Sequence, residues 1–156
     1  GDLSSLARLV QMDVLVLNRC SEVSGNLTAL SPLAVLRGLH LKGCTKIKGE
    51  LSEVAAHHAM LEWLLLEDCH LVTGDLSSLA GLTRLEVLNL NRCSDVKGDL
   101  GSLAPLANLQ KLYLDNCDQI YGRMAQEGIE ITGYDNHNPR PAPSNDAPPA
   151  TASSAE

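Results

Sequence analysis

The sequence contains no phenylalanine, and aromatic residues make up only 3% of its 156 residues. A core built around large rings is therefore excluded, and leucine must supply most of the apolar packing. No run of apolar residues is long enough to cross a bilayer, and we expect no membrane contact from this segment. The 12 basic residues are scattered and outnumbered by 19 acidic ones, which argues against binding of nucleic acid.

What the sequence does contain is a unit of about two dozen residues that recurs in register. Its clearest marker is a cysteine at the same place in each unit: Cys20, Cys44, Cys69, Cys93 and Cys117. A leucine frame precedes each cysteine, and Val or Ile and then Gly follow it, as Leu85, Leu88, Leu90, Val96 and Gly98 do around Cys93. A recurrence of this kind predicts a solenoid rather than a closed globular core.

Each part of the unit has a physical interpretation. The Leu-x-Leu pair places two side chains on one face of a strand, and stacked units would join these faces into a continuous core. The recurring glycine is typical of a tight turn or a positive φ. Leucines spaced by three follow it and favour a 3₁₀ turn or a short helix. The sequence therefore predicts an α/β solenoid, an arc with a parallel sheet on its concave side and 3₁₀ or short helical returns on its convex side.

The motif Leu-x-x-Leu-x-Leu-x-x-Cys resembles the signature of the leucine-rich-repeat family over residues 1 to about 124. The stretch from Cys93 to Leu103 is similar to the 24-residue plant-type subclass, with Cys in place of the usual Asn and Asp-Leu-Ser in place of Ile-Pro. The resemblance implies a right-handed arc that recognises a protein or peptide.

The two ends of the chain differ from the middle. Gly1–Leu6 aligns with Gly74–Leu79, so the chain opens within a repeat and is expected to be part of a longer protein. We assign 1–135 to the solenoid, with about five repeats and a C-terminal cap strand near 129–132. Residues 136–156 are rich in Pro, Ala and Ser and are expected to form a disordered tail.

The five cysteines are expected to form a structural column rather than a reactive site. A thiol nucleophile would need one distinctive cysteine beside a base, and zinc would need ligands that converge from several directions. Thiols that all point inward from one row lack disulfide geometry. We therefore expect no metal and no cofactor, and five reduced thiols favour a cytoplasmic setting.

The histidines and acidic residues have mainly structural interpretations. His57 and His58 lie in the only 25-residue unit; His57 aligns with Leu33 when the unit is aligned from the left, and His58 does when it is aligned from the right. We expect one at the core boundary and the other in solvent, with a metal or proton-switch role as the alternative. The acidic residues after the turn glycine are expected to form a solvated turn edge, because stacked carboxylates repel one another.

The candidate binding surface consists of the residues between the inward leucines, which should face the concave side. The predicted site residues are Trp63, Leu65, Val87, His40, Asn89, Tyr113 and Lys111. Exposed apolar residues edged by charge are typical of protein contacts, although Val and Leu also simply suit strands. The sequence thus favours a non-catalytic, monomeric interaction module of a scaffold or adaptor. A fragment of an extracellular recognition receptor is the alternative.

Overall fold

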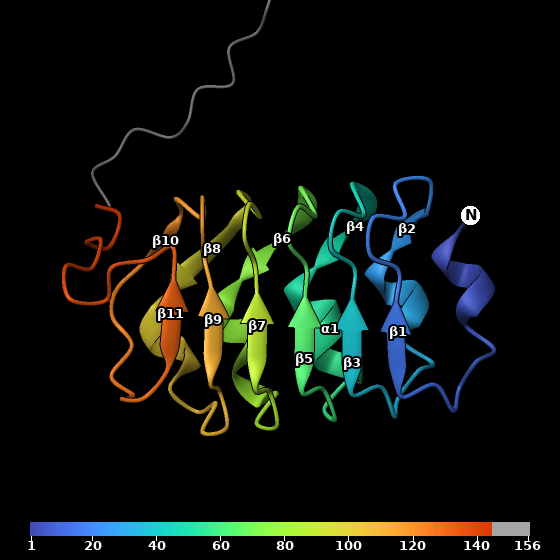
Figure 1. Ribbon diagram of the computed structural model, residues 1–156, viewed down its shortest axis with the longest axis horizontal. Helices are drawn as coiled ribbons and strands as arrows, with labels where there is room; N and C mark the ends of the chain where they lie inside the picture. Colours follow the sequence, from blue (N-terminus) through green and yellow to red (C-terminus); the bar gives the residue numbers. More distant parts are fainter. Residues whose placement is uncertain (145–156) are drawn as a thin grey trace, which may run out of the picture.

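The structure is a computed structural model that describes residues 1–144, wound into a solenoid (Figure 1). One strand from each coil joins a six-stranded parallel sheet: β1 (Val14–Val16), β3 (Gly38–His40), β5 (Trp63–Leu65), β7 (Val87–Asn89), β9 (Lys111–Tyr113) and β11 (Glu130–Thr132). The central leucines pair in register from β1 to β9. Leu39, Leu64 and Leu88 are fully buried. The predicted α/β solenoid and its strand register are confirmed.

A second parallel sheet, which the sequence did not predict, lies across the core from the first. Its strands are β2 (Ser24–Asn26), β4 (Lys46–Glu50), β6 (Leu71–Asp75), β8 (Val96–Asp99) and β10 (Ile120–Tyr121). Four of the recurring glycines, Gly25, Gly49, Gly74 and Gly98, lie within these strands, so the predicted tight turn is wrong there. The positive φ is present, at 122° for Gly98, and a Cβ on Gly98 would lie 2.7 Å from Asp75 Oδ1. Glycine is thus required by the close approach of the preceding coil.

Short helices return each coil on the convex side, as predicted. They are η1 (Leu3–Leu6), η2 (Leu27–Leu30), α1 (Leu51–His57), η3 (Leu76–Gly81) and η4 (Leu100–Leu103). Each 3₁₀ helix begins after an Asp or Asn whose side chain accepts a backbone N–H two residues further on, and Glu50 and Glu53 form a capping box on α1. The acidic residues expected to form a solvated edge are therefore helix caps with defined partners.

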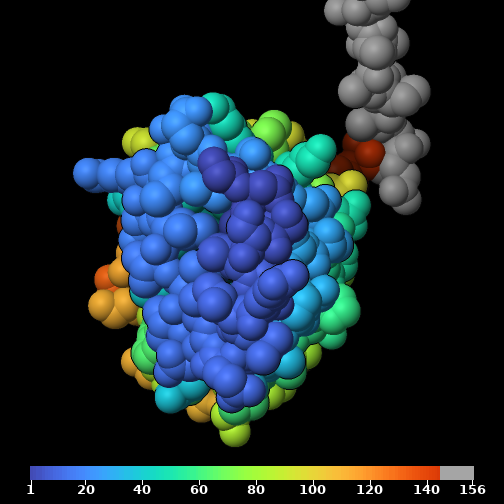
Figure 2. All heavy atoms as spheres, turned by 90° about the vertical axis from the view of Figure 1, so that its right-hand side faces the viewer, coloured from blue at the N-terminus to red at the C-terminus, as the bar shows by residue number. Residues whose placement is uncertain are grey.

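The first coil forms the N-terminal end of the solenoid, which faces the viewer in Figure 2. Its exposed large apolar side chains are Leu9, Val10, Val14 and Val16. Leu17 and Cys20 are only half-buried, whereas Leu41 and Cys44 are fully buried at the same places in the next coil. The difference arises because a coil in the middle of the stack is covered on both sides.

The C-terminal end is closed by residues beyond β11. Asn136 exchanges two hydrogen bonds with the backbone of Met124, at 2.8 and 3.0 Å. Arg140 donates from Nη1 to the Cys117 carbonyl at 2.7 Å, and its guanidinium lies 5.3 Å from the centre of the Tyr134 ring. The packed part of the chain thus reaches Arg140, past the boundary predicted at residue 136. The part of the predicted tail from 145 to 156 lies outside the described residues.

The concave sheet as a candidate binding surface

The seven predicted site residues all lie on β3, β5, β7 and β9, in two adjacent columns. Pairing of the strands aligns Gly38, Trp63, Val87 and Lys111 in one column, and His40, Leu65, Asn89 and Tyr113 in the other. Lys111 is exposed and the other six predicted residues are half-buried. The fold therefore brings the predicted residues onto one continuous surface.

The same columns continue onto β1, where the set predicted from the sequence stopped. Val14 pairs with Gly38 and Val16 with His40, and these valines are 38% and 55% exposed. They extend the apolar surface around Trp63 by one strand. Their place in the repeat columns was visible in the sequence, but a valine in a strand gives no signal that it is uncovered.

Gly38 is the low point of this surface, and three side chains close over it. A Cβ added at Gly38 would lie 3.1 Å from Val14 Cγ1, and 3.4 Å from both His40 Nε2 and Trp63 Cε3. His40 Nε2 is buried here without a hydrogen-bond partner among the described residues. Burial lowers the pKa of His40, because loss of water disfavours the charged ring. His40 and Trp63 thus form a closely packed, uncharged cluster.

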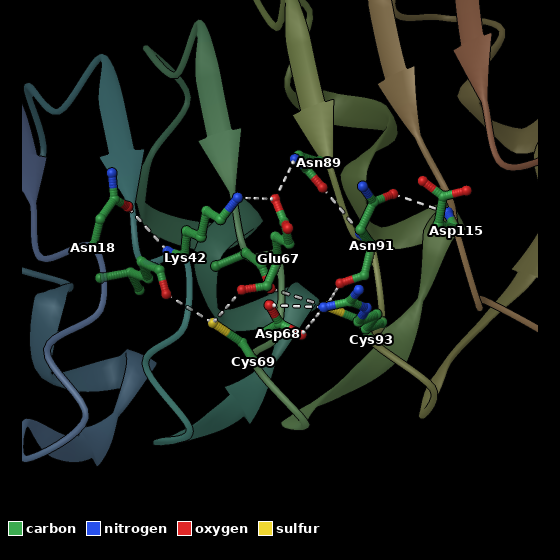
Figure 3. A network of polar contacts seen from close by, with 12 residues as sticks. Asn18, Lys42, Glu67, Asp68, Cys69, Asn89, Asn91, Cys93 and Asp115 are labelled. Atoms are coloured by element: carbon green, nitrogen blue, oxygen red, sulfur yellow. Dashed lines mark hydrogen bonds and ion pairs between the residues drawn. The ribbon is translucent and has the colours of Figure 1, made fainter.

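Polar residues edge the surface where the strands end (Figure 3). Lys42 and Glu67 form an ion pair of 2.9 Å, and Asn89 donates to Glu67 Oε2 at 3.3 Å. Asn91 accepts a hydrogen bond from the backbone N–H of Asp115 at 2.8 Å. These contacts link successive coils and hold the ends of the strands in place.

Further charges near the sheet are also paired between coils. Arg92 lies 3.2 Å from Asp68, and Arg37 binds both oxygens of Glu62 at the opposite end of the strands. Exposed pairs of this kind contribute little to stability. Their main effect is to neutralise the rim, so that the centre of the surface is apolar and carries little net charge.

The cysteines form a column inside the solenoid, and four of the five donate a hydrogen bond to the coil before them. The thiols of Cys44, Cys69, Cys93 and Cys117 donate to the carbonyls of Leu17, Leu41, Leu66 and Leu90, at 2.9 to 3.1 Å. Burial raises the pKa of Cys69 to about 12 and that of Cys117 to about 11. All five cysteines are free, and Cys20, at the N-terminal end, lacks such a preceding carbonyl.

The two adjacent histidines have different environments. His58 is buried and His57 is exposed, so the repeat is aligned with its neighbours through His58. Within residues 1–144, no three or more His, Cys, Asp or Glu side chains gather in a way that could hold a metal ion. In the same range, no helix is long and apolar enough to cross a membrane.

Known proteins resemble the chain in structure rather than in overall sequence. Protein-family models give no match, and neither do the sequences of curated proteins. Internalin C2 of Listeria monocytogenes matches with a TM-score of 0.55 and 27% identity, over 75% of this chain and 47% of its own. The leucine-rich-repeat ectodomain of the Arabidopsis thaliana receptor kinase SOBIR1 matches with a TM-score of 0.54 and 20% identity, over 76% of this chain and 68% of its own. The chain therefore has the leucine-rich-repeat fold.

A second Listeria monocytogenes internalin, InlF, matches this leucine-rich-repeat solenoid with a TM-score of 0.57 and 16% identity, over 85% of this chain and 38% of its own. The chain thus spans about half the length of internalin C2 and less of InlF. Because fold does not determine function, any ligand must be argued from the concave surface itself.

Proposed function

We propose that this leucine-rich-repeat solenoid is a non-catalytic interaction module, part of a larger scaffold or adaptor, that binds a protein or peptide segment on its concave sheet. The observation that supports this most directly is the apolar surface of Val14, Val16, Trp63, Leu65 and Val87, which the fold leaves partly open to solvent. Exposed apolar surface rimmed by polar groups is typical of protein contacts, and Trp and Tyr are enriched at their energetic centres.

The partner we propose presents apolar side chains rather than a strand or a strong charge. The backbones of β3, β5, β7 and β9 are hydrogen-bonded on both sides, which leaves no strand edge at the centre of the surface. The rim pairs Lys42–Glu67 and Arg92–Asp68 neutralise charge at its border. Binding should therefore depend on burial of apolar area around Trp63 and only weakly on salt.

The chemistry of the thiols supports a role without catalysis. A cysteine nucleophile acts as the thiolate, which a lowered pKa favours. Burial instead raises the pKa of Cys44, Cys69, Cys93 and Cys117. These four thiols remain protonated near neutral pH and are used as internal hydrogen-bond donors.

Selection of peptides from a displayed random library on the immobilised chain tests the proposed surface. Selected peptides should shift the emission of Trp63, the only tryptophan. Trp63→Ala and Tyr113→Ala should each weaken binding at least about tenfold, the loss of roughly 1.4 kcal/mol or more expected at a contact centre. Lys97→Ala, on the exposed side of β8, is the matched control and should bind like the wild type.

Unchanged affinity of the Trp63→Ala and Tyr113→Ala variants would contradict a concave binding site. Circular dichroism and thermal melts of each variant must accompany the titrations, because a half-buried tryptophan also contributes packing. A variant that melts like the wild type but binds less well separates recognition from folding.

We also propose a reducing, cytoplasmic setting for the chain, based on its five free thiols. Alkylation during lysis of the native source, followed by mass spectrometry, should find all five cysteines unpaired. A disulfide that links any two of them would favour the extracellular alternative.

A further inference from the structure

The apolar part of the concave sheet is longer across the strands than along them. It extends from Val14 and Val16 on β1 to Val87 on β7, and along each strand it includes only two outward positions, such as Trp63 and Leu65. Strand spacing and rise make it roughly 14 Å long and about 7 Å wide. A surface of this shape fits an extended segment that lies along the axis of the solenoid.

A row of polar side chains borders this surface, two residues beyond the outward positions of the strands (Figure 3). Its members are Asn18, Lys42, Glu67, Asn91 and Asp115. Glu67 pairs with Lys42 at 2.9 Å. Asn18 accepts the backbone N–H of Lys42, and Asn91 accepts that of the next member of the row. The first four members thus have side-chain partners within the solenoid.

Asp115 differs from the others because nothing engages its carboxylate. Its backbone N–H joins the row, but within residues 1–144 the carboxylate accepts no hydrogen bond and pairs with no cation. Lys111, on the same strand, lies 3.8 Å from Glu130 instead. Residues 145–156 contain no Lys, Arg or His that could supply a cation. Asp115 is half-buried, and a carboxylate that loses water without gaining a partner raises the free energy of the folded chain.

The uncompensated charge in the two rows that border the surface has one sign. In the row before the strands, Asp13 and Glu86 pair with no cation among the described residues, and the two cations of the bordering rows are both paired with glutamates. Arg19, just beyond the border, lies at the β1 end, about 19 Å from Asp115 by strand spacing. The border near β7 and β9 therefore favours a partner with a basic side chain.

We infer that the concave surface recognises an extended segment with an apolar anchor and, about three residues away, a Lys or Arg that binds the carboxylate of Asp115. This inference rests on the interaction role proposed above and adds one basic residue to the apolar partner. The anchor packs on Trp63 and Leu65, on β5. Two strand spacings, about 10 Å, separate β5 from β9, and an extended chain covers this distance in about three residues. The stem of the basic side chain then crosses Tyr113, and its charged end reaches Asp115.

Peptides selected on the immobilised chain from a displayed random library test the spacing. Among peptides whose binding is weakened by Trp63→Ala, we expect Lys or Arg to be enriched over the unselected library at that distance from an apolar residue. Equal frequencies of basic residues in the two pools would overturn the inference. A chain that retains no peptide above background would overturn both the inference and the proposed function.

A double-mutant cycle on one selected peptide tests the contact itself. Replacing the basic residue of the peptide by Gln should weaken binding to the wild type about fivefold, the upper range for an ion pair partly open to water. The same replacement should hardly affect binding to Asp115→Asn. This variant should keep the fold, because the row already carries asparagine at Asn18 and Asn91. Asp95→Asn removes the same charge from an exposed position before β8 and is the matched control, which should behave like the wild type.

The cycle separates failure of this inference from failure of the proposed function. If Trp63→Ala weakens binding but the Gln peptide loses the same affinity for the wild type and for Asp115→Asn, the chain binds on its concave sheet without using Asp115, and the inference is wrong. If neither Trp63→Ala nor Asp115→Asn changes the affinity, the inference and the proposed function are both wrong.

Discussion

Gly38 determines how closely the side chains at the centre of the concave surface pack. Its φ is unexceptional, so alanine can adopt the backbone, but the added Cβ would meet Val14 at 3.1 Å and Trp63 at 3.4 Å. We predict that Gly38→Ala displaces the indole and shifts its fluorescence to longer wavelength, because the ring gains contact with water. The loss of stability should be small, about 1 kcal/mol, since the neighbours are side chains at an open surface.

Gly81→Ala is the matched control for that substitution. A Cβ at Gly81, the last residue of η3, would meet nothing within 4 Å. Alanine also restricts the unfolded chain more than glycine does, which favours the folded state. Its emission spectrum should equal that of the wild type. An unchanged spectrum for Gly38→Ala as well would show that Trp63 does not rest against this glycine.

At the scale of the elements, the column of thiols joins each coil to the one before it and should make the fold sensitive to alkali. Burial raises the pKa of Cys69 to about 12, so the folded chain holds this proton more tightly than the unfolded chain. The free energy of unfolding should be unaffected below the pH range in which an ordinary thiol ionises. It should then fall as the pH rises through that range towards the raised pKa of Cys69 in the folded chain. Denaturant melts at increasing pH measure this loss.

Cys69→Ser is the control for the alkaline effect, because a hydroxyl can donate to the Leu41 carbonyl without ionising in this range. Its stability should fall less steeply in alkali than that of the wild type. In native alkylation at neutral pH, Cys20 should react first, since it is half-buried and the other four thiols are fully buried. Equal labelling of all five cysteines would contradict the column.

The sequence predicted those elements whose side chains repeat and missed those that depend on backbone contacts. The Leu-x-Leu pairs predicted the register of the concave strands, because a shift by one residue would turn the leucines away from the core. The second sheet was missed because its strands are short and contain a glycine, which strand propensity disfavours. The caps at Asp75 and Asp99 were missed because a cap can be recognised only once the start of its helix is known.

The site shows the same division between side-chain pattern and local geometry. The columns that hold Trp63 and Tyr113 followed from the repeat, but the packing over Gly38 depends on rotamers that the pattern does not encode. The sequence left open which of the two adjacent histidines is buried. In the structure, the N–H of His58 donates to the carbonyl of Val54, four residues back, at the end of α1. This helical turn accommodates the extra residue of the repeat and leaves His58 as the buried histidine.

For the molecule as a whole, stability should depend on where along the solenoid a defect lies, because each coil contacts only its neighbours. Leu64→Asp would bury an unpaired carboxylate in the third of five repeats. We expect loss of several kcal/mol and complete unfolding, since neither side then retains the three intact repeats that stability requires. Leu15→Asp, in the partly open first coil, should instead release that coil and leave the rest folded.

Hydrogen exchange followed residue by residue distinguishes these two outcomes. Leu15→Asp should lose protection in β1 and β2 but keep it in β7 and β9, whereas Leu64→Asp should lose it throughout. Leu65→Asp is the control for strand register, because its side chain faces the half-exposed concave side one residue away from the core. If Leu65→Asp unfolds the chain as fully as Leu64→Asp does, burial does not alternate along β5, and the concave surface on which the proposed function rests does not exist.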